Sequence, residues 1–252
     1  ELHDSTGIIG LHPALTQLVL RDSTSDFSDS LKMKPLLVAP EGGKNIISGI
    51  GLDLRFNPGA IGIKWMADSV SYVNDLFFVP GNRHRKIQGL GMGQSYGLWV
   101  TNRGGGTFKN IWAPNDFSRC PFYVNNTDTP GRIYEVSLEH HKNVELKLKD
   151  VRNWEFYALQ TEENLGGEQA LPVFVENCSQ IKFANLLCYR IAAISVPFPS
   201  AIKLHQSDRI KISGMHVYSS GPFPFDHAIV GENSGMVVSN LKFTIFTNMN
   251  DD

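Results

Sequence analysis

The chain has 252 residues, of which 42% are hydrophobic and 19% charged, and its formal net charge is −2 at pH 7. These values allow one substantial core and give no basic surface of the kind that binds nucleic acid. No stretch approaches the roughly 18 consecutive apolar residues of a membrane-spanning helix, so we expect no membrane span.

Residues 1–44 precede the regular part of the sequence. They show no repeat, and residues 22–30, which contain several Ser, Thr and Asp, have the composition of a loop. Strands left exposed at the end of a stacked β-structure tend to add further strands, so natural proteins cover them. We therefore predict an N-terminal cap over residues 1–44 and one β-helix domain over residues 45–252. Because the chain ends directly after an expected strand, we expect further protein beyond it.

A short phrase recurs along residues 45–252: an apolar residue, a spacer, then Asn, Asp or Gly, then another apolar residue. Its six copies are centred on Asp75, Asn110, Asp150, Asn185, Gly214 and Asn240. These residue types tolerate the left-handed backbone of a tight corner. Successive copies are 35, 40, 35, 29 and 26 residues apart. One coil needs only roughly twenty-odd residues, so the surplus predicts long loops. Related phrases at Gly49 and Gly89 fit this spacing less well.

Pairs of alternating apolar residues lie upstream of the phrases. The pairs are Ile61/Ile63, Leu98/Val100, Val136/Leu138, Val173/Val175, Ile202/Leu204 and Ala228/Val230. Such alternation is typical of a strand with one buried face. Strands and corners repeated in this way predict an all-β fold, a single-stranded parallel β-helix with long loops. In that fold Leu138, Val175 and Leu204 should line one interior wall.

The same register predicts two columns of outward side chains. The residues after each pair are Lys64, Thr101, Glu139, Glu176, His205 and Gly231, and those within each pair are Gly62, Trp99, Ser137, Phe174, Lys203 and Ile229. Neighbours in a column should stand roughly 4.8 Å apart. We expect Trp99 and Phe174 to stack on sugar rings, with Lys203 and His205 beside them. Alternatively, loops cover the two aromatic residues, which then only enlarge the core.

Carboxyl groups concentrate in residues 134–141 and 153–164. Hydrolysis of a glycosidic bond takes two of them, one protonating the leaving oxygen and the other activating water or attacking directly. The candidate catalytic residues are Glu139, His140, Glu162, Glu163 and Glu176, with Tyr157 as a further substrate-binding candidate. Glu139 and Glu176 form the expected close pair, Glu139 and Glu162 or Glu163 the wider one. His140 would tune a neighbouring carboxylate. The alternatives are that the adjacent acids 162 and 163 lie in a solvated loop and that one of the two histidines at 140 and 141 is only a corner residue.

Residues 47–53, 57–63, 97–100 and 104–108 resemble glycoside hydrolase family 55 and its relatives, and residues 45–246 resemble right-handed parallel β-helix proteins of the pectate-lyase-like class. The resemblance implies a right-handed β-helix and a secreted β-1,3-glucanase, placed outside the cell or in the periplasm. It also implies an inverting mechanism with a general acid Glu, and an active site between two β-helices. This chain supplies one of them, so a second β-helix domain or chain is an expected partner. The family's catalytic Glu has no matching motif here.

Three functions follow as hypotheses. The first is a glycoside hydrolase that acts on a polysaccharide such as a β-1,3-glucan. The second is a polysaccharide lyase, in which Lys203 or His205 would abstract the proton. The third is a non-catalytic β-helix that binds carbohydrate. No acidic cluster has the spacing of a metal site, so we expect no cofactor, although a lyase could use calcium.

Overall fold

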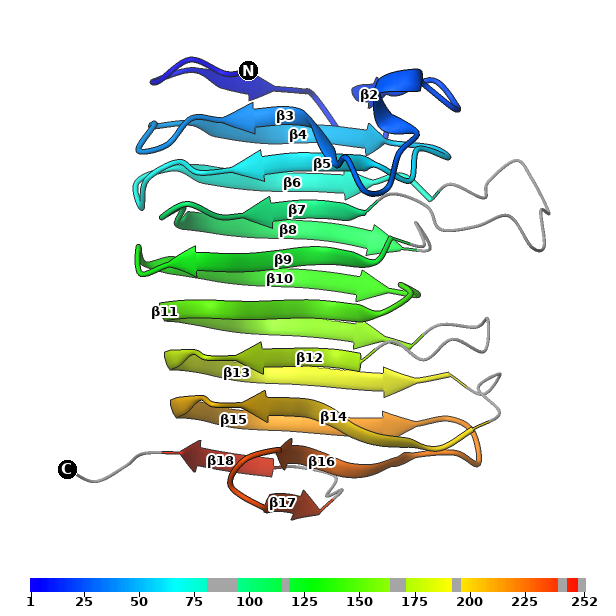
Figure 1. The fold of residues 1–252 in the computed structure, drawn as a ribbon, viewed down its shortest axis with the longest axis vertical. Coiled ribbons are helices and arrows are strands. Elements are labelled where there is room, and N and C mark those ends of the chain that lie inside the picture. The colour runs from blue at the N-terminus through cyan, green and yellow to red at the C-terminus, as the bar shows by residue number, and fades with distance from the viewer. Residues whose placement is uncertain (81–94, 115–117, 164–170, 192–195, 240–243, 249–252) are drawn as a thin grey trace.

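The computed structural model describes residues 1–80, 95–114, 118–163, 171–191, 196–239 and 244–248. Within them the chain winds as a single parallel β-solenoid of about six turns, and no α-helix occurs in this part. Figure 1 shows the turns stacked along the long axis. The predicted all-β fold is therefore confirmed. The right-handed winding stays a prediction.

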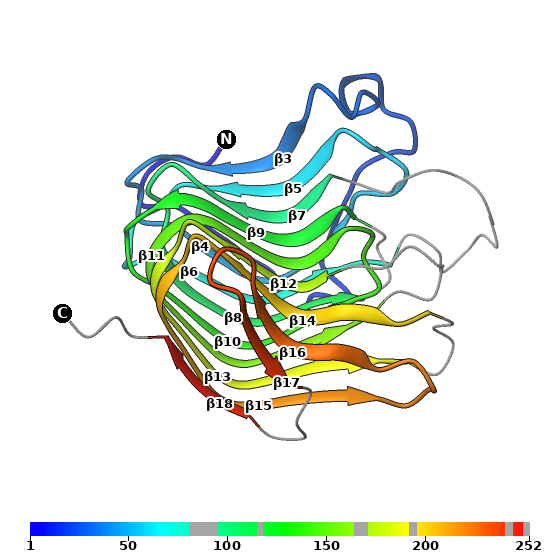
Figure 2. The ribbon, with the colours of Figure 1, turned by 60° about the horizontal axis from the view of Figure 1, so that its bottom comes forward.

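Two parallel sheets form the solenoid, and we call them sheet A and sheet B. Sheet A contains β1 (Gly7–Ile9), β2 (Gln17–Val19), β4 (Ile46–Asp53), β6 (Tyr72–Phe78), β8 (Gly106–Pro114), β10 (Gly131–Glu139), the second part of β11 (Val144–Glu162), β13 (Ser179–Arg190), β15 (Asp208–Ser219) and β18 (Thr244–Asn248). Sheet B contains β3 (Lys34–Ala39), β5 (Ala60–Trp65), β7 (Tyr96–Val100), β9 (Cys120–Thr127), the first part of β11, β12 (Leu171–Glu176), β14 (Phe198–His205), β16 (Phe225–Gly231) and β17 (Met236–Ser239). The sheets enclose the core, and strand β11 bends from one into the other (Figure 2).

The core is filled by alternating apolar side chains from both sheets. Phe108 stacks on Trp154 with ring centroids 5.6 Å apart, and Phe156 stacks on Phe183 at 4.7 Å. All four side chains are fully buried. Burial of one such ring contributes roughly 1.5–3 kcal/mol. This continuous apolar interior holds the turns in register.

The expected interior wall is only partly correct. Val175 and Leu204 are register neighbours in sheet B, but Leu138 belongs to β10 in sheet A. All three side chains are buried, with exposed fractions of 0%, 4% and 1%. The reason is that an alternating apolar pattern marks a strand with one buried face and does not say which sheet the strand joins.

One corner of the solenoid is a column of left-handed residues. It consists of Gly49, Asp75, Asn110, Glu135, Ala158, Asn185 and Gly214, with φ between 50° and 69°. The residues just before them are in register from strand to strand. Gly49 therefore belongs to the column, although the motif around it was expected to fit the spacing of the repeat less well.

Glu135 and Ala158 occupy two corners that the sequence pattern does not predict. Between Asn110 and Asn185 the chain makes three coils rather than the predicted two, so the long intervals do not represent long loops there. Asp150 lies in the opposite corner, where it accepts a hydrogen bond from Asn177 Nδ2. The expected corners at Gly89 and Asn240 lie outside the described residues.

Both ends of the solenoid differ from its middle. Short strands β1 and β2 pair with successive parts of β4, whereas β3 pairs with β5 as a strand of sheet B. At the other end, β17 and β18 run antiparallel to β16 and β15. The segment predicted as a cap thus contributes one strand to sheet B.

The direction of the strands brings several chain segments to one edge. Strands β8, β10, β11 and β13 of sheet A are parallel, and Figure 1 shows that they end along the same side of the molecule. Side chains at those ends therefore lie close together even though 20 or more residues separate them in sequence. Loops that leave a rigid scaffold at one edge are a common place for function.

Candidate functional site

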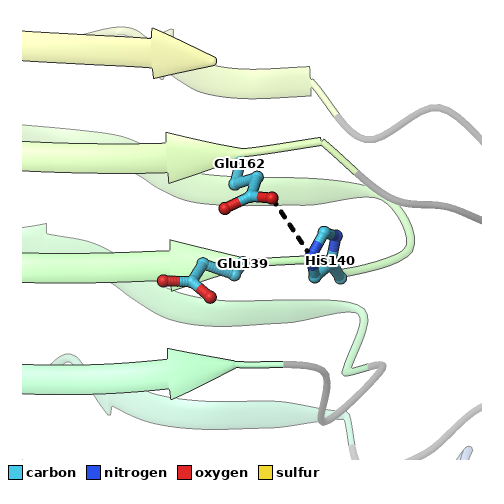
Figure 3. A group of neighbouring side chains, drawn as sticks. All are labelled: Glu139, His140 and Glu162. Atoms are coloured by element: carbon cyan, nitrogen blue, oxygen red, sulfur yellow. Dashed lines mark ion pairs between the residues drawn. The ribbon is translucent and has the colours of Figure 1, made fainter. Parts of the chain in front are cut away.

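Glu139 and Glu162 are the last residues of β10 and β11, and they are register neighbours in sheet A. Figure 3 shows their side chains beside His140 at the edge where the strands end. The predicted pairing was wrong on this point: Glu139 neighbours Pro114 and Glu162, whereas Glu176 neighbours Lys149 and His205 in sheet B. Glu139 and Glu162 are thus the close pair.

The carboxylate of Glu139 accepts two hydrogen bonds at the same oxygen. Trp112 Nε1 donates to Oε1 over 3.0 Å, and Ser137 Oγ donates to Oε1 over 2.7 Å. Donors of this kind suit an ionised carboxylate, because hydrogen bonds to a charged acceptor are stronger than those to a neutral one. Its other oxygen has no hydrogen bond within the described part of the chain. Glu139 is therefore held in place by two donors at one oxygen.

Glu162 is in a different environment. Burial raises the pKa of its carboxyl group, and the negative charge of Glu139 raises it further. Its side chain is 19% exposed. Both causes favour the protonated form, because each makes the ionised form more costly.

His140 provides an acceptor for that proton. Its Nδ1 lies 2.9 Å from the carbonyl oxygen of Glu163, which can only accept, so Nδ1 carries the hydrogen. Burial lowers the pKa of His140 and keeps the ring neutral. Nε2 then presents a lone pair 3.4 Å from Glu162 Oε1. This contact is favourable when Glu162 is protonated, the form that its raised pKa favours.

The same three side chains could hold a metal ion. One ligand atom each from Glu139, His140 and Glu162 lies within 4.8 Å of the others, the one such group among the described residues. Carboxylate oxygen and imidazole nitrogen are ligands of zinc and similar ions. The sequence analysis expected no metal site, so this capability comes from the structure.

Glu163 is placed apart from this pair although it follows Glu162 directly. Its side chain is 1% exposed, and neither carboxyl oxygen has a hydrogen-bond partner among the described residues. Burial raises the pKa of Glu163 well above its ordinary value, Glu145 adds to the rise, and Arg190 offsets part of it. The solvated-loop alternative is wrong for both acids, because Glu162 ends a strand and Glu163 is buried.

His141 belongs to a buried network that the sequence did not indicate. Its Nε2 donates to the carbonyl oxygen of Ala113 over 2.9 Å, so its Nδ1 accepts from Ser118 Oγ over 2.8 Å. Glu145 Oε2 lies 3.6 Å from Nε2. The Ser, His and Glu side chains are all fully buried. The network therefore joins β8, the segment before β9, the β10–β11 connection and the start of β11, and it presents no nucleophile to solvent.

Trp99, Phe174 and Lys203 lie on the outer face of sheet B rather than beside Glu139. In register order the column reads Lys64, Trp99, Tyr123, Lys147, Phe174 and Lys203. Trp99 has Lys64 over one ring at 5.3 Å and stacks with Tyr123 at 6.4 Å. Phe174 has Lys147 at 5.2 Å and Lys203 at 5.5 Å. These rings already contact their neighbours through cation–π and stacking interactions, each worth about 0.5–1 kcal/mol at exposed positions.

Glu176 and His205 are also on sheet B. Burial opposes ionisation of Glu176, but Lys149 at 3.0 Å and Lys147 at 3.6 Å outweigh it and lower its pKa. Glu232 binds both His205 Nδ1, at 2.9 Å, and Lys203 Nζ, at 2.5 Å. These charged residues are paired with one another on a face separate from the Glu139–Glu162 pair.

Tyr157 lies in sheet A, directly before the left-handed corner residue Ala158 and not at the end of the strand. Its ring stacks on Tyr134 with centroids 5.1 Å apart, and its Oη accepts a 3.0 Å hydrogen bond from Lys182 Nζ. Four residues, including the left-handed corner residue Ala158, lie between it and Glu162. Tyr157 is therefore placed away from the carboxyl pair.

Trp112 and Ser137 are the site residues that the sequence analysis missed as partners of Glu139. Each is two positions after a left-handed corner residue, and they are register neighbours. If sequence positions had been numbered from each left-handed corner residue instead of from the apolar pairs, Trp112 and Ser137 would have been aligned with each other. That numbering requires knowing that Glu135 occupies a corner.

Comparisons with known proteins add no family assignment. No family model matches the chain, and no curated protein matches it significantly. Within the described residues, no helix has the length and apolar character needed to cross a membrane. The geometry of the site therefore has to support any proposed function by itself.

Proposed function

We propose that this protein is a glycoside hydrolase that acts on a polysaccharide, with Glu139 and Glu162 as its two catalytic carboxyl groups. One observation carries the proposal: two register neighbours at the same edge of sheet A have different surroundings, since Glu139 accepts two hydrogen bonds and burial raises the pKa of Glu162. Pairs of carboxyl groups whose surroundings favour different protonation states are the recurring arrangement of acid and base in glycosidases.

The roles follow from those environments. Glu162, whose pKa is raised, would donate a proton to the glycosidic oxygen as the bond to the anomeric carbon breaks. Glu139, one oxygen of which accepts no hydrogen bond from the described residues, would attack the anomeric carbon as a carboxylate. Water, deprotonated by Glu162, would then release the sugar and return the proton to Glu162. Each step conserves the proton and leaves both side chains as they began.

The short separation of the pair favours this retaining route over inversion. Carboxyl groups roughly 5–5.5 Å apart are typical of retaining enzymes, and inverting enzymes leave roughly 6.5–9.5 Å for a water molecule. Here one oxygen of each group lies within 4.8 Å of the other. This differs from the inversion that the resemblance to family 55 implies.

The resemblance supports a β-1,3-glucan as the first substrate to test, and with it an extracellular or periplasmic location and a second β-helix as partner. The lyase hypothesis is less well supported, because Lys203 and His205 both contact Glu232 and neither is placed as a free base. The hypothesis of a β-helix that only binds carbohydrate is also less well supported, because binding alone gives no role to the different surroundings of Glu139 and Glu162.

Incubation with laminarin and with polygalacturonate separates the three hypotheses. Reducing sugar released from laminarin, without the ultraviolet absorbance of an unsaturated product, supports hydrolysis. That absorbance with polygalacturonate would support a lyase, and binding without either product a non-catalytic role. Glu139→Gln and Glu162→Gln should each abolish hydrolysis, whereas Glu176→Gln should retain it. Full activity in both of the first two variants would overturn the assignment.

A further inference from the structure

Trp112 lies directly beside the carboxyl pair and is unusually exposed for a tryptophan. It projects outward from β8, and 45% of its surface is accessible to solvent. Its Nε1 donates a 3.0 Å hydrogen bond to Glu139 Oε1. Its register neighbour on β10 is Ser137, a small residue that also donates to Glu139. The indole therefore leans toward the catalytic edge over a short side chain.

Only one face of this indole is covered by an aromatic neighbour. Phe77 on β6 stacks against it with centroids 5.1 Å apart and an interplanar angle of 27°. Among the described residues, no second ring and no cation stacks on Trp112. Trp99 on sheet B is different, because Lys64 and Tyr123 both contact its ring. Phe77 thus stacks on one face of an indole whose other face is covered by no ring or cation of the described residues.

An open indole face next to a carboxylate matches the chemistry of a sugar ring. Pyranose rings present apolar C–H faces that pack on aromatic rings, and their hydroxyl groups donate to carboxylates. The nearby carboxylate of Glu139 disfavours a sugar that is itself anionic. A neutral pyranose with an uninterrupted C–H face therefore fits best.

We propose that the open face of Trp112 is a subsite for a neutral pyranose unit, adjacent to Glu139 and Glu162. This inference rests on the proposed hydrolase function and extends it by naming the sugar class and the residue that binds it. Because the indole N–H also holds Glu139, occupation of the subsite and orientation of the carboxylate are coupled. Trp112 would bind one sugar unit while the pair acts on the adjoining linkage.

Binding is tested in the Glu162→Gln background, so that hydrolysis does not interfere. Laminarihexaose and cellohexaose are the neutral probes, trigalacturonate is the acidic probe, and calorimetry gives the Kd. Trp112→Ala should weaken binding of a neutral probe about tenfold, which is what loss of one stacking contact amounts to. Trp112→Phe should retain most of the affinity, because it keeps a ring. Trp99→Phe, the matched change on sheet B, should leave the Kd unchanged.

Equal binding by Trp112→Ala and its parent would overturn the subsite, and so would tighter binding of trigalacturonate than of both neutral probes. Circular dichroism and thermal unfolding of each variant show whether a loss reflects misfolding, and in that case Trp112→Phe decides. The two proposals fail separately. Trp112-dependent binding without any hydrolysis by the unmodified protein leaves the subsite and removes the hydrolase. Hydrolysis by the unmodified protein, together with a Kd that Trp112→Ala does not change, would keep the hydrolase and remove the subsite.

Discussion

Glu139 and Glu162 are neighbours on parallel strands, yet one accepts two hydrogen bonds and the other is a partly buried acid 3.4 Å from an imidazole nitrogen. Strand pairing alone would give both carboxyl groups the same surroundings. The difference comes from Trp112 and Ser137 on one side and His140 on the other. It gives each carboxyl group a distinct expected role.

The stereochemistry of the product is the first prediction. Because the two carboxyl groups are close, we expect the first-formed sugar to retain the configuration of the substrate. Proton NMR of the anomeric signals during early hydrolysis of laminarin distinguishes the two outcomes. A product that is initially inverted would show that Glu139 does not act as the nucleophile.

The pH profile tests the role of Glu162. A general acid works only while protonated, so activity should persist above the ordinary pKa of a glutamate, 4.5, and fall as pH rises through the raised pKa of Glu162. Measuring kcat between pH 3 and pH 9 locates this descending limb. Glu176→Gln, on the other sheet, should leave the limb in place. A limb at or below pH 4.5 contradicts the assignment.

The buried side chain of Glu163 predicts how folding stability depends on pH. Its pKa is raised in the folded state, so the folded protein binds the proton more tightly than the unfolded chain does. The contribution of Glu163 to stability should therefore be fully present below about pH 4.5 and be lost as pH rises toward its folded pKa, by up to about 1.4 kcal/mol per pH unit.

Glu163→Gln should remove this contribution. Urea unfolding at several pH values between 5 and 8 should give a shallower loss of stability in the variant than in the original protein. Glu135→Gln, at an exposed corner, is the matched control and should keep the original slope. Identical slopes in all three proteins would mean that Glu163 ionises as freely when folded as when unfolded.

Ala158 has a left-handed backbone with φ of 54° in an exposed corner, a conformation that a side chain with Cβ resists. Ala158→Gly should raise the free energy of unfolding by about 0.5–1 kcal/mol, because glycine adopts this conformation without strain. Ala184→Gly, one position before the next corner and in ordinary strand backbone, should lower it by about 0.5–1 kcal/mol. Urea denaturation measures both, and destabilisation by both changes would contradict the corner assignment.

Metal dependence separates the hydrolase from a calcium-dependent lyase. Hydrolysis by two carboxyl groups needs no ion, so EDTA should leave the rate unchanged. Added Zn²⁺ should inhibit, because it would bind the grouped atoms of Glu139, His140 and Glu162 and displace the proton. A loss of activity in EDTA that calcium restores would instead favour the lyase.

The sequence was informative about the fold because its signals are local. Alternation such as Val173/Val175 predicts a strand with one buried face, and Asp75, Asn110, Asn185 and Gly214 marked corners that the structure contains. Glu135 and Ala158 gave no such signal, because neither residue type is favoured in a left-handed corner. Because those two corners were not predicted, Glu139 was expected beside Glu176 instead of beside Glu162.

By itself, then, the amino-acid order determined that the chain coils as stacked strands around an apolar interior, and it singled out Glu139, Glu162 and His140 as chemically notable. Only the tertiary structure decided that Glu139 adjoins Glu162, that Trp112 supports them, and that Glu163 is buried. The physical reason is that apolar alternation repeats every two residues in either sheet. The neighbour of a given strand is instead set by how many residues each coil uses, which depends on backbone conformation at every corner.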